Sequence, residues 1–394
     1  MAKENMSKLE RLIQQYCPDG VEYVKLDSVA NICRGTRVVK SQLSDKGYPV
    51  YQNCLTPMGY FERSNCNAGI TFVICGGAAG NVGYTDVECW AADDCEFIIG
   101  GHQVINRYIY YYLMTKQNYL LSKVRKASIP RLSPSIIKDL EIPLPPLPVQ
   151  EEIVRILDAF TELQAELQAE LQKRKQQYNY YLDNLLNFKN INRGGYQAEV
   201  RWMKMSEVAS FTYGYTSKAQ DLGNVRYIRI TDITDKGQLN PKNGKYVSLT
   251  EEVRPYLLKK GDLIMARTGA TYGKTLYYNE DYPSAYASFL IKITLNQLVD
   301  SKYYWHFTRS SIYWEQANRL VGGGAQPQFN TGAISQVIIP LPSLEEQNRI
   351  VFILDRFDRL TNDLTSGLPA EIEKRRQQYE FYRDKLLTFK RKEA

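Results

Sequence analysis

The chain has 394 residues, of which 44% are hydrophobic and 24% charged, a composition that is typical of a globular protein and excludes a disordered one. No apolar run is long enough for a transmembrane helix, and the charged start of the sequence predicts no secretory signal peptide. Seven cysteines, all between Cys17 and Cys95 and without a CxxC pair, predict reduced thiols rather than disulfides or a zinc site. We therefore expect a cytoplasmic protein without a membrane partner.

The net charge of +7 is concentrated in two separate parts of the chain. Residues 1–139 hold 16 basic and 13 acidic side chains, and residues 197–336 hold 17 and 12, whereas the segment after each block is close to neutral. Two basic blocks are typical of a protein that binds a polyanion at two places. The 30 tyrosines are compatible with nucleic-acid binding and equally with ordinary β-strands.

An internal repeat is the strongest signal in the sequence. LEIPLPPLPVQEEIVRILDAF (140–160) recurs as VIIPLPSLEEQNRIVFILDRF (337–357), and KRKQQYNYYLDNLLNFK (173–189) recurs as KRRQQYEFYRDKLLTFK (374–390). The offset rises from 197 to 201, so the second copy has four additional residues between the two matches. The chain is thus a duplication of a module followed by a long helix. The predicted segments are an N-terminal helix within 1–20, modules at 21–141 and 195–338, and long helices at 142–194 and 339–394.

The segments after the modules have the pattern of long helices. Apolar residues recur in steps of three and four from Val149 through Ile153, Ile156 and Phe160, which predicts a heptad seam in a helix over residues 147–188. A helix of this length needs a partner for its apolar stripe, and the matching helix of the other copy is the obvious one. We expect Gly367 and Pro369 to interrupt the second helix. Taken alone, this pattern also fits a structural coiled-coil scaffold that only dimerises the chain.

The modules are predicted to be β-rich, because short apolar or alternating runs are bounded by Gly, Asn and Asp turns. The predicted strands are 70–75, 95–100, 225–230, 262–266 and 286–293, and the predicted helices are 106–121 and 301–318. The expected fold class is α+β, with a twisted sheet and a few short helices in each module.

Motifs for catalysis are absent from the sequence. GATYGKT (269–275) resembles a phosphate-binding loop, but three residues rather than four separate its first Gly from the Gly-Lys-Thr, and no helical pattern follows. The corresponding CGGAAGNVGY (75–84) lacks the lysine, so a shared glycine-rich turn explains both copies better, and a P-loop enzyme is the alternative. Only His102 and His306 are available as histidines, which argues against a catalytic triad or a histidine metal site. We expect a chain that binds rather than catalyses, with no catalytic or metal-binding residue.

Two diverged modules, each followed by a near-identical helix, resemble the specificity (S) subunit of type I restriction-modification enzymes over the whole chain. The most specific motifs are IPLPPLPVQEEIVRILD (142–158), IPLPSLEEQNRIVFILD (339–355) and the KR-x-QQY…LL-x-FK tails. The module starts CPDGVEYVKL and EVRWMKMSEVA and the loop ARTGATYGKT are also similar to that family. The sequence departs from the family at Val149, where a glutamate usually precedes the glutamine.

The resemblance implies that each module is a target recognition domain that reads one half of a split double-stranded DNA site. It further implies that the long helices pack antiparallel, set the spacer, and dock two methylation (M) subunits, with the N-terminal helix lying against the C-terminal helix. S-adenosylmethionine, ATP and Mg would belong to those partners and to two restriction (R) subunits, and no cofactor to this chain. The docking candidates are Gln150, Ile153, Phe160, Gln347, Ile350 and Phe357.

Candidate base-reading residues are donors on loops where the backbone can approach DNA. Arg can pair with guanine and Asn or Gln with adenine, whereas most Lys would meet phosphate, and for each residue a solvated loop side chain is the competing interpretation. In the first module the candidates are Arg34, Arg37, Lys40, Asn81, His102 and Gln103. In the second they are Tyr215, Thr216, Ser217, Lys218, Arg267, Thr271, Tyr272 and Lys274.

The first long helix contains TELQAELQAELQ (161–172), three consecutive four-residue units. These residues are strong helix formers, so the simplest interpretation is a stable helix. A four-residue unit is also an insertion that a coiled coil absorbs without losing its seam, which leads to the hypothesis that the number of units sets the length of the DNA spacer.

Overall fold

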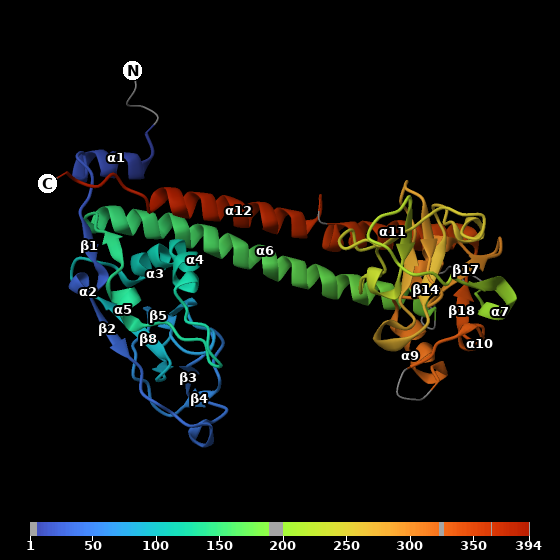
Figure 1. Cartoon of the computed structure of the whole chain (residues 1–394), viewed down its shortest axis with the longest axis horizontal. Coiled ribbons are helices and arrows are strands. Elements are labelled where there is room, and N and C mark those ends of the chain that lie inside the picture. The colour runs from blue at the N-terminus through green and yellow to red at the C-terminus, as the bar shows by residue number, and fades with distance from the viewer. Residues whose placement is uncertain (1–5, 189–199, 323–326, 364, 394) are drawn as a thin grey trace. The chain divides into compact units, whose positions relative to one another are not determined.

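The computed structural model describes residues 6–188, 200–322, 327–363 and 365–393 (Figure 1). It divides into two compact units, the first formed by Met1–Gln168 with Glu371–Ala394 and the second by Ala169–Ala370. Each unit combines one module with parts of both long helices. The division therefore runs through the long helices.

The module of the first unit is built on three small sheets. Its elements are α1 (Lys8–Tyr16), β1 (Tyr23–Lys25), α2 (Leu26–Val29), β2 (Ala30–Arg34), β3 (Tyr48–Tyr51), β4 (Tyr60–Phe61), β5 (Ile70–Ile74), β6 (Val82–Thr85), β7 (Trp90–Ala91), β8 (Cys95–Gly100), α3 (Asn106–Thr115), α4 (Gln117–Ser122), α5 (Pro134–Lys138) and β9 (Glu141–Pro143). The central sheet has the order β2-β8-β5-β6 and is antiparallel, the second has the order β4-β3-β7, and β1 pairs with β9. Helix α3 packs on the central sheet through buried Tyr108, Ile109 and Tyr112.

The module of the second unit repeats this plan strand by strand. Its elements are β10 (Arg201–Lys204), α7 (Met205–Val208), β11 (Ala209–Tyr213), β12 (Val225–Ile228), β13 (Tyr246–Val247), β14 (Leu263–Ala266), β15 (Thr275–Tyr277), β16 (Ser284–Tyr286), β17 (Leu290–Leu295), α8 (Ser301–Phe307), α9 (Ser311–Leu320), α10 (Thr331–Ile334) and β18 (Ile338–Leu341). The sheet orders are β11-β17-β14-β15, β13-β12-β16 and β10-β18, which match those of the first module position for position. The predicted duplication and the α+β class are therefore confirmed.

Three predicted elements are each divided in two. The strand expected at 286–293 is β16 followed by β17, because Leu290 N–H bonds back to the carbonyl of Ala287 and makes a turn between them. The helix expected at 301–318 is α8 and α9, because the Ser310 side chain accepts a hydrogen bond from Tyr313 N–H and caps a new helix. The helix at 106–121 is also divided, at Lys116 between α3 and α4, where no side chain caps the second helix.

The long helices follow the sequence prediction closely. Helix α6 runs unbroken over Leu147–Asn187, whereas the second is divided into α11 (Leu344–Asn362) and α12 (Leu368–Leu386). The break includes Gly367, where a Cβ would lie 2.5 Å from the carbonyl oxygen of Arg359. No other residue type fits this close approach without a shift of the backbone.

Within each unit, one end of α6 packs against the second helical segment. In the first unit the ring of Phe160 lies 5.6 Å from that of Tyr382, and Val149 near the start of α6 shares a core with Leu387 near the end of α12. The two segments are therefore antiparallel there. In the second unit Tyr181 stacks on Phe357 of α11, with 5.2 Å between ring centroids.

Helix α1 packs into the first unit as the resemblance implied. Ser7 and Glu10 form a capping box at its start. Leu9 lies in the same hydrophobic core as Leu387, and Val21 N–H bonds to the carbonyl of Lys390 at 2.9 Å. Helix α1 and the end of the C-terminal helical segment therefore share one hydrophobic core in the first unit.

Candidate nucleic-acid interface

Each module carries a glycine-rich turn at the same end of its central sheet, over residues 75–81 and 267–274. The two turns have matching backbone hydrogen bonds, since Gly80 N–H donates to Ile74 O and Gly273 N–H donates to Ala266 O, both at 2.8 Å. Glycines with positive φ lie at equivalent ends of the turns, and these are Gly77, Gly80, Gly269 and Gly273. A side chain is strained in that conformation, which is why glycine recurs in two otherwise diverged sequences.

The turn at 267–274 is not a phosphate-binding loop of the P-loop type. It leads into strand β15, which pairs with β14 in a hairpin, whereas a P-loop leads into a helix whose first N–H groups face the phosphates. The ammonium group of Lys274 forms an ion pair with Asp235. The structure therefore does not support the P-loop alternative.

A second loop lies against each glycine-rich turn, and sequence reasoning missed it. In the first module Arg125 and Arg131 form a β-bridge, and Arg131 forms another with Gly76 of the turn. In the second module the same two bridges join Gly322 with Gln328 and Gln328 with Thr268. The first loop reads RKASIPR (125–131), and its three basic residues are at least partly exposed. Its basic cluster just before the IPLP motif was the signal that could have found it.

The structure brings several first-module candidates to one end of the sheet. Arg34 ends β2 opposite Glu96. Asn81 is the last residue of the glycine-rich turn, which starts after Ile74, the residue of β5 that pairs with Cys95. Arg34 Nε donates to the carbonyl of Asp93 at 2.9 Å, and Asn81 Nδ2 donates to the carbonyl of Ala78 at 2.8 Å. The exposed side chains of Arg37 and Lys40 follow directly after this end of β2. These four candidates can act together with loop 125–131.

His102 and Gln103 lie at the opposite end of the same sheet. They follow Gly100, which pairs with Ala30 at the start of β2, whereas Arg34 pairs with Glu96 near the start of β8. Four residues at about 3.4 Å each, about 14 Å in all, separate these two pairs. The carbonyl of Gln103 accepts a hydrogen bond from Gln150 at the start of α6. The structure does not bring these two candidates together with the other four.

Four second-module candidates follow β11 at the equivalent sheet end. The Tyr215 hydroxyl donates to Glu252 at 2.9 Å, and its ring lies 5.3 Å from that of Tyr256, so this side chain is held in place. The next three, Thr216, Ser217 and Lys218, are exposed. They offer several donors and acceptors beside one fixed aromatic ring.

The other four second-module candidates belong to the glycine-rich turn. Two neighbours fix the position of the Arg267 side chain. Its Nε donates to the carbonyl of Ser288, and its guanidinium lies 5.3 Å from the ring centroid of Tyr213. Tyr272 donates its hydroxyl to Asn318 at 2.7 Å. Thr271 is partly exposed beside it, and Lys274 is already paired with Asp235. The guanidinium of Arg267 is therefore held in a defined orientation.

Residues 18–177 and 197–374 match the family model described as the type I restriction modification DNA specificity domain. The chain is 32% identical to a putative type I restriction enzyme specificity subunit of Haemophilus influenzae, over 98% of this chain and 100% of that one. It is 35% identical to the EcoR124I/EcoR124II specificity subunit of Escherichia coli, over 74% of this chain and 73% of that one. This chain belongs to the type I restriction-modification specificity family.

Two solved structures share the fold of this chain. A type I restriction-modification S subunit from M. genitalium has a TM-score of 0.61 at 16% sequence identity, covering 93% of this chain and 96% of that one. A structure from work on assembly and conformational transition of the type I R-M system has a TM-score of 0.57 at 16% identity, covering 94% and 98%. Both likenesses support two β-rich modules joined by long helices. Across the described ranges, no helix combines the length and apolar character needed to cross a membrane.

Four of the six residues expected to dock partner subunits in this specificity-family chain point into their own module. Gln150, Ile153, Gln347 and Ile350 are each 0% exposed. Phe160 and Phe357 are partly exposed and pack on aromatic residues of the neighbouring helical segment. The four buried side chains have no surface to offer a partner, so their positions support internal packing instead of docking.

An aspartate at the same place in each copy anchors the long helix to its module. In the first unit Asp158 accepts from Arg107 Nε at 2.8 Å and from the Tyr111 hydroxyl. In the second unit Asp355 lies 2.9 Å from His306 Nε2 and pairs with Lys302. Burial lowers the pKa of His306, and the carboxylate opposes that shift only in part. His306 is thus a packed residue.

Proposed function

We propose that each module of this chain reads one half of a bipartite double-stranded DNA target, and that the long helices set the spacer between the halves. The observation that carries the proposal is the duplicated sheet end, where a glycine-rich turn, a second loop and exposed basic side chains recur in both modules. The loops differ in sequence while the scaffold is the same, as expected if each reads a different half-site. The relatives from H. influenzae and E. coli are named as specificity subunits of type I restriction enzymes.

We further propose that two methylation subunits dock on the exposed faces of the long helices and that two restriction subunits complete the complex. The support is a pair of highly exposed aromatic residues at repeat-equivalent positions, Tyr180 at 65% and Phe381 at 63%. Each is followed by a tyrosine and lies within the KR-x-QQY…LL-x-FK tail that the two copies share. Two equivalent surfaces fit two copies of one partner, and aromatic side chains are frequent energetic anchors of interfaces.

The chain contributes recognition and its partners contribute catalysis. S-adenosylmethionine, ATP and Mg belong to those partners, and the complex acts on DNA in the cytoplasm. Recognition by one chain of this kind needs only phosphate contacts for position and base contacts for sequence. The loops at the two sheet ends offer both kinds of donor.

Exchange of one module tests the proposal. Residues 21–139 are replaced with the first module of another family member, and the hybrid is expressed with its methylation and restriction subunits. Sequencing of the methylated genome is expected to show one changed half-site and one unchanged half-site. A change in both halves, or in neither, would overturn the modular assignment. A scaffold without a recognition role would also lack the steep salt dependence of DNA binding that phosphate contacts produce.

A further inference from the structure

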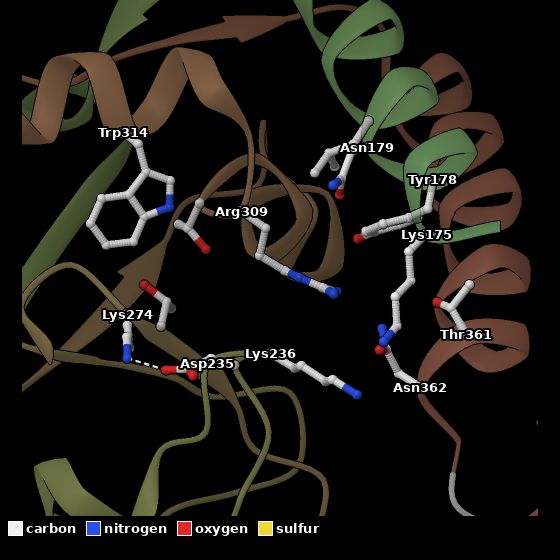
Figure 2. Close-up of a pocket in the computed structure, with 14 residues that line it drawn as sticks. Lys175, Tyr178, Asn179, Asp235, Lys236, Lys274, Arg309, Trp314, Thr361 and Asn362 are labelled. Atoms are coloured by element: carbon white, nitrogen blue, oxygen red, sulfur yellow. Dashed lines mark hydrogen bonds and ion pairs between the residues drawn. The ribbon is translucent and has the colours of Figure 1, made fainter. Parts of the chain in front are cut away.

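The second unit contains a cavity of about 330 Å³ whose wall is strongly basic (Figure 2). Four cationic side chains line it: Lys175 of α6, Lys236 of the turn before β13, Lys274 before β15, and Arg309 between α8 and α9. Asp235 is the one carboxylate in the wall, and it pairs with Lys274. The excess positive charge therefore comes from the other three side chains, which project into the same space from three elements.

Arg309 is held rigidly at this wall. Its Nη2 donates to Asp358 Oδ1 at 2.7 Å, and the guanidinium packs 4.5 Å from the ring centroid of Trp305 and 5.2 Å from that of Tyr178. Asp358 is shared, because it also accepts from Asn362 Nδ2 at 2.8 Å. The Nη1 group is buried and has no hydrogen-bond partner among the described residues. A buried donor without an acceptor is unfavourable, so an acceptor in the cavity would stabilise the site.

Lys175 and Lys236 face each other without a counter-charge. Neither ammonium group forms an ion pair with any carboxylate in the described parts of the chain. Burial and then the positive charge of Lys175 lower the pKa of Lys236. An anion bound between the two groups would remove this repulsion.

In the first unit the cation at the equivalent position is paired with two glutamates. Lys175 of the second unit corresponds to Arg376 of the first unit, at the offset of 201 residues that relates the tails. Arg376 pairs with Glu373 at 2.8 Å and with Glu380 at 2.7 Å. The residues that correspond to these two glutamates are Gln172 and Asn179. In the second unit, α6 thus has a cation at this position, Lys175, but neither of the two carboxylates that pair with the equivalent Arg376 in the first unit.

We propose that this cavity binds one phosphate group through Lys175, Lys236 and Arg309. Phosphate presents several acceptor oxygens to donors on different sides, and the arginine–lysine combination matches that geometry. The group comes from the DNA backbone or from a small phosphate-bearing ligand, and the first source rests on the proposed function. The cavity would then fix the second module on its DNA, or sense a soluble ligand, without reading any base.

The test uses the full chain in its complex with the methylation subunits, with inorganic phosphate as the probe. Thermal unfolding is measured in millimolar phosphate and in sodium chloride of the same ionic strength, because a ligand of the native state raises the midpoint. The decisive variant is Gln172→Glu with Asn179→Glu, which installs the carboxylates of the first unit and should fold. Phosphate affinity is expected to fall by about tenfold or more in this variant. Lys173→Ala is the matched control, an exposed lysine on the same helix outside the cavity, and should bind phosphate normally.

A second measurement identifies the source of the phosphate group. The slope of log affinity for target DNA against log salt falls by about 0.9 for each lost backbone contact. If the double variant has this smaller slope, the cavity holds the DNA backbone; an unchanged slope with lost phosphate binding assigns a soluble ligand. The proposed site would be overturned if phosphate raised the unfolding midpoint of wild type and of the double variant equally. It would also be overturned if phosphate raised the midpoint of wild type no more than sodium chloride does. Correct methylation of both half-sites in that case would leave the proposed function intact.

Discussion

Gln150 and Gln347 make the same three hydrogen bonds at the same place in the two copies. Each side-chain oxygen accepts a backbone N–H from the start of the module's helical pair, of Ile105 at 3.0 Å and of Asp300 at 2.9 Å. Each Nε2 donates to two carbonyls, one before that helical pair and one in the proline-rich stretch before the long helix. The glutamine of the repeated motif therefore connects the long helix to its module by hydrogen bonds.

Replacement of Gln347 by alanine is expected to destabilise the second unit. The change leaves one N–H and two carbonyls without partners in a fully buried place, which we expect to cost about 3 kcal/mol. Chemical denaturation monitored by tryptophan fluorescence measures it. Gln176→Ala, an exposed position of α6, is the control and should change stability little. A normal free energy of unfolding together with lost methylation-subunit binding would instead restore the docking role.

His306 gives the second unit a pH dependence with a predictable sign. Burial lowers its pKa in the folded chain, so the unfolded chain binds the proton more readily. The stabilising contribution is complete above the ordinary histidine pKa of about 6.5 and is lost as the pH falls from there through the lower pKa of the folded chain. Stability measured from neutral to mildly acidic pH is expected to decline more in wild type than in His306→Gln. The control is His102→Gln, which changes the exposed histidine of the first module and should have the same pH–stability profile as wild type. If the stability of His306→Gln declines as much as that of wild type, the assignment is contradicted.

The sequence predicted the parts of this fold that depend on local pattern. The buried strands β5 and β8, the unbroken α6 and the interruption at Gly367 all follow from periodicity, turn residues and backbone sterics. The inward role of Gln150 was missed because helical periodicity does not say which side of an amphipathic helix meets the module. The loop at 125–131 was missed for a related reason, since its bridge to Gly76 joins residues far apart in the chain.

Exposed aromatic residues on the helices are expected to dominate binding of the methylation subunits. Tyr180→Ser and Phe381→Ser each remove one exposed anchor, with an expected loss of about 2 kcal/mol in binding free energy at that surface. Native mass spectrometry of the complex should show one methylation subunit lost in each single variant and both lost in the double variant. Leu222→Ser, at a module residue that is 84% exposed, is the control. Retention of both subunits by the double variant would place the docking surface elsewhere.

The four-residue units of α6 are expected to act as a ruler for the DNA spacer. Leu163 and Leu167 lie on the same helix as buried Leu171 at intervals of four residues, so each unit contributes one leucine to an unbroken helix. Deletion of residues 165–168 shortens a helix by about 6 Å and rotates the rest of the helix by about 40°. One base-pair step of DNA advances about 3.4 Å and turns about 34–36°, so the rotation matches one base pair. The deletion is therefore expected to shorten the unread spacer by one base pair and an added unit to lengthen it by one, with both half-sites unchanged.

Methylome sequencing of strains that carry the deletion, the insertion and a matched three-residue deletion is the measurement for the ruler. Removal of residues 165–167 turns the remaining part of the helix by about 60° in the opposite sense. It also moves Leu171 away from the packed side, so this variant should lose activity rather than choose a new spacer. An active four-residue deletion that still methylates the original spacing would show that the modules adjust to DNA independently of helix length. In that case the repeated units serve only to keep α6 helical.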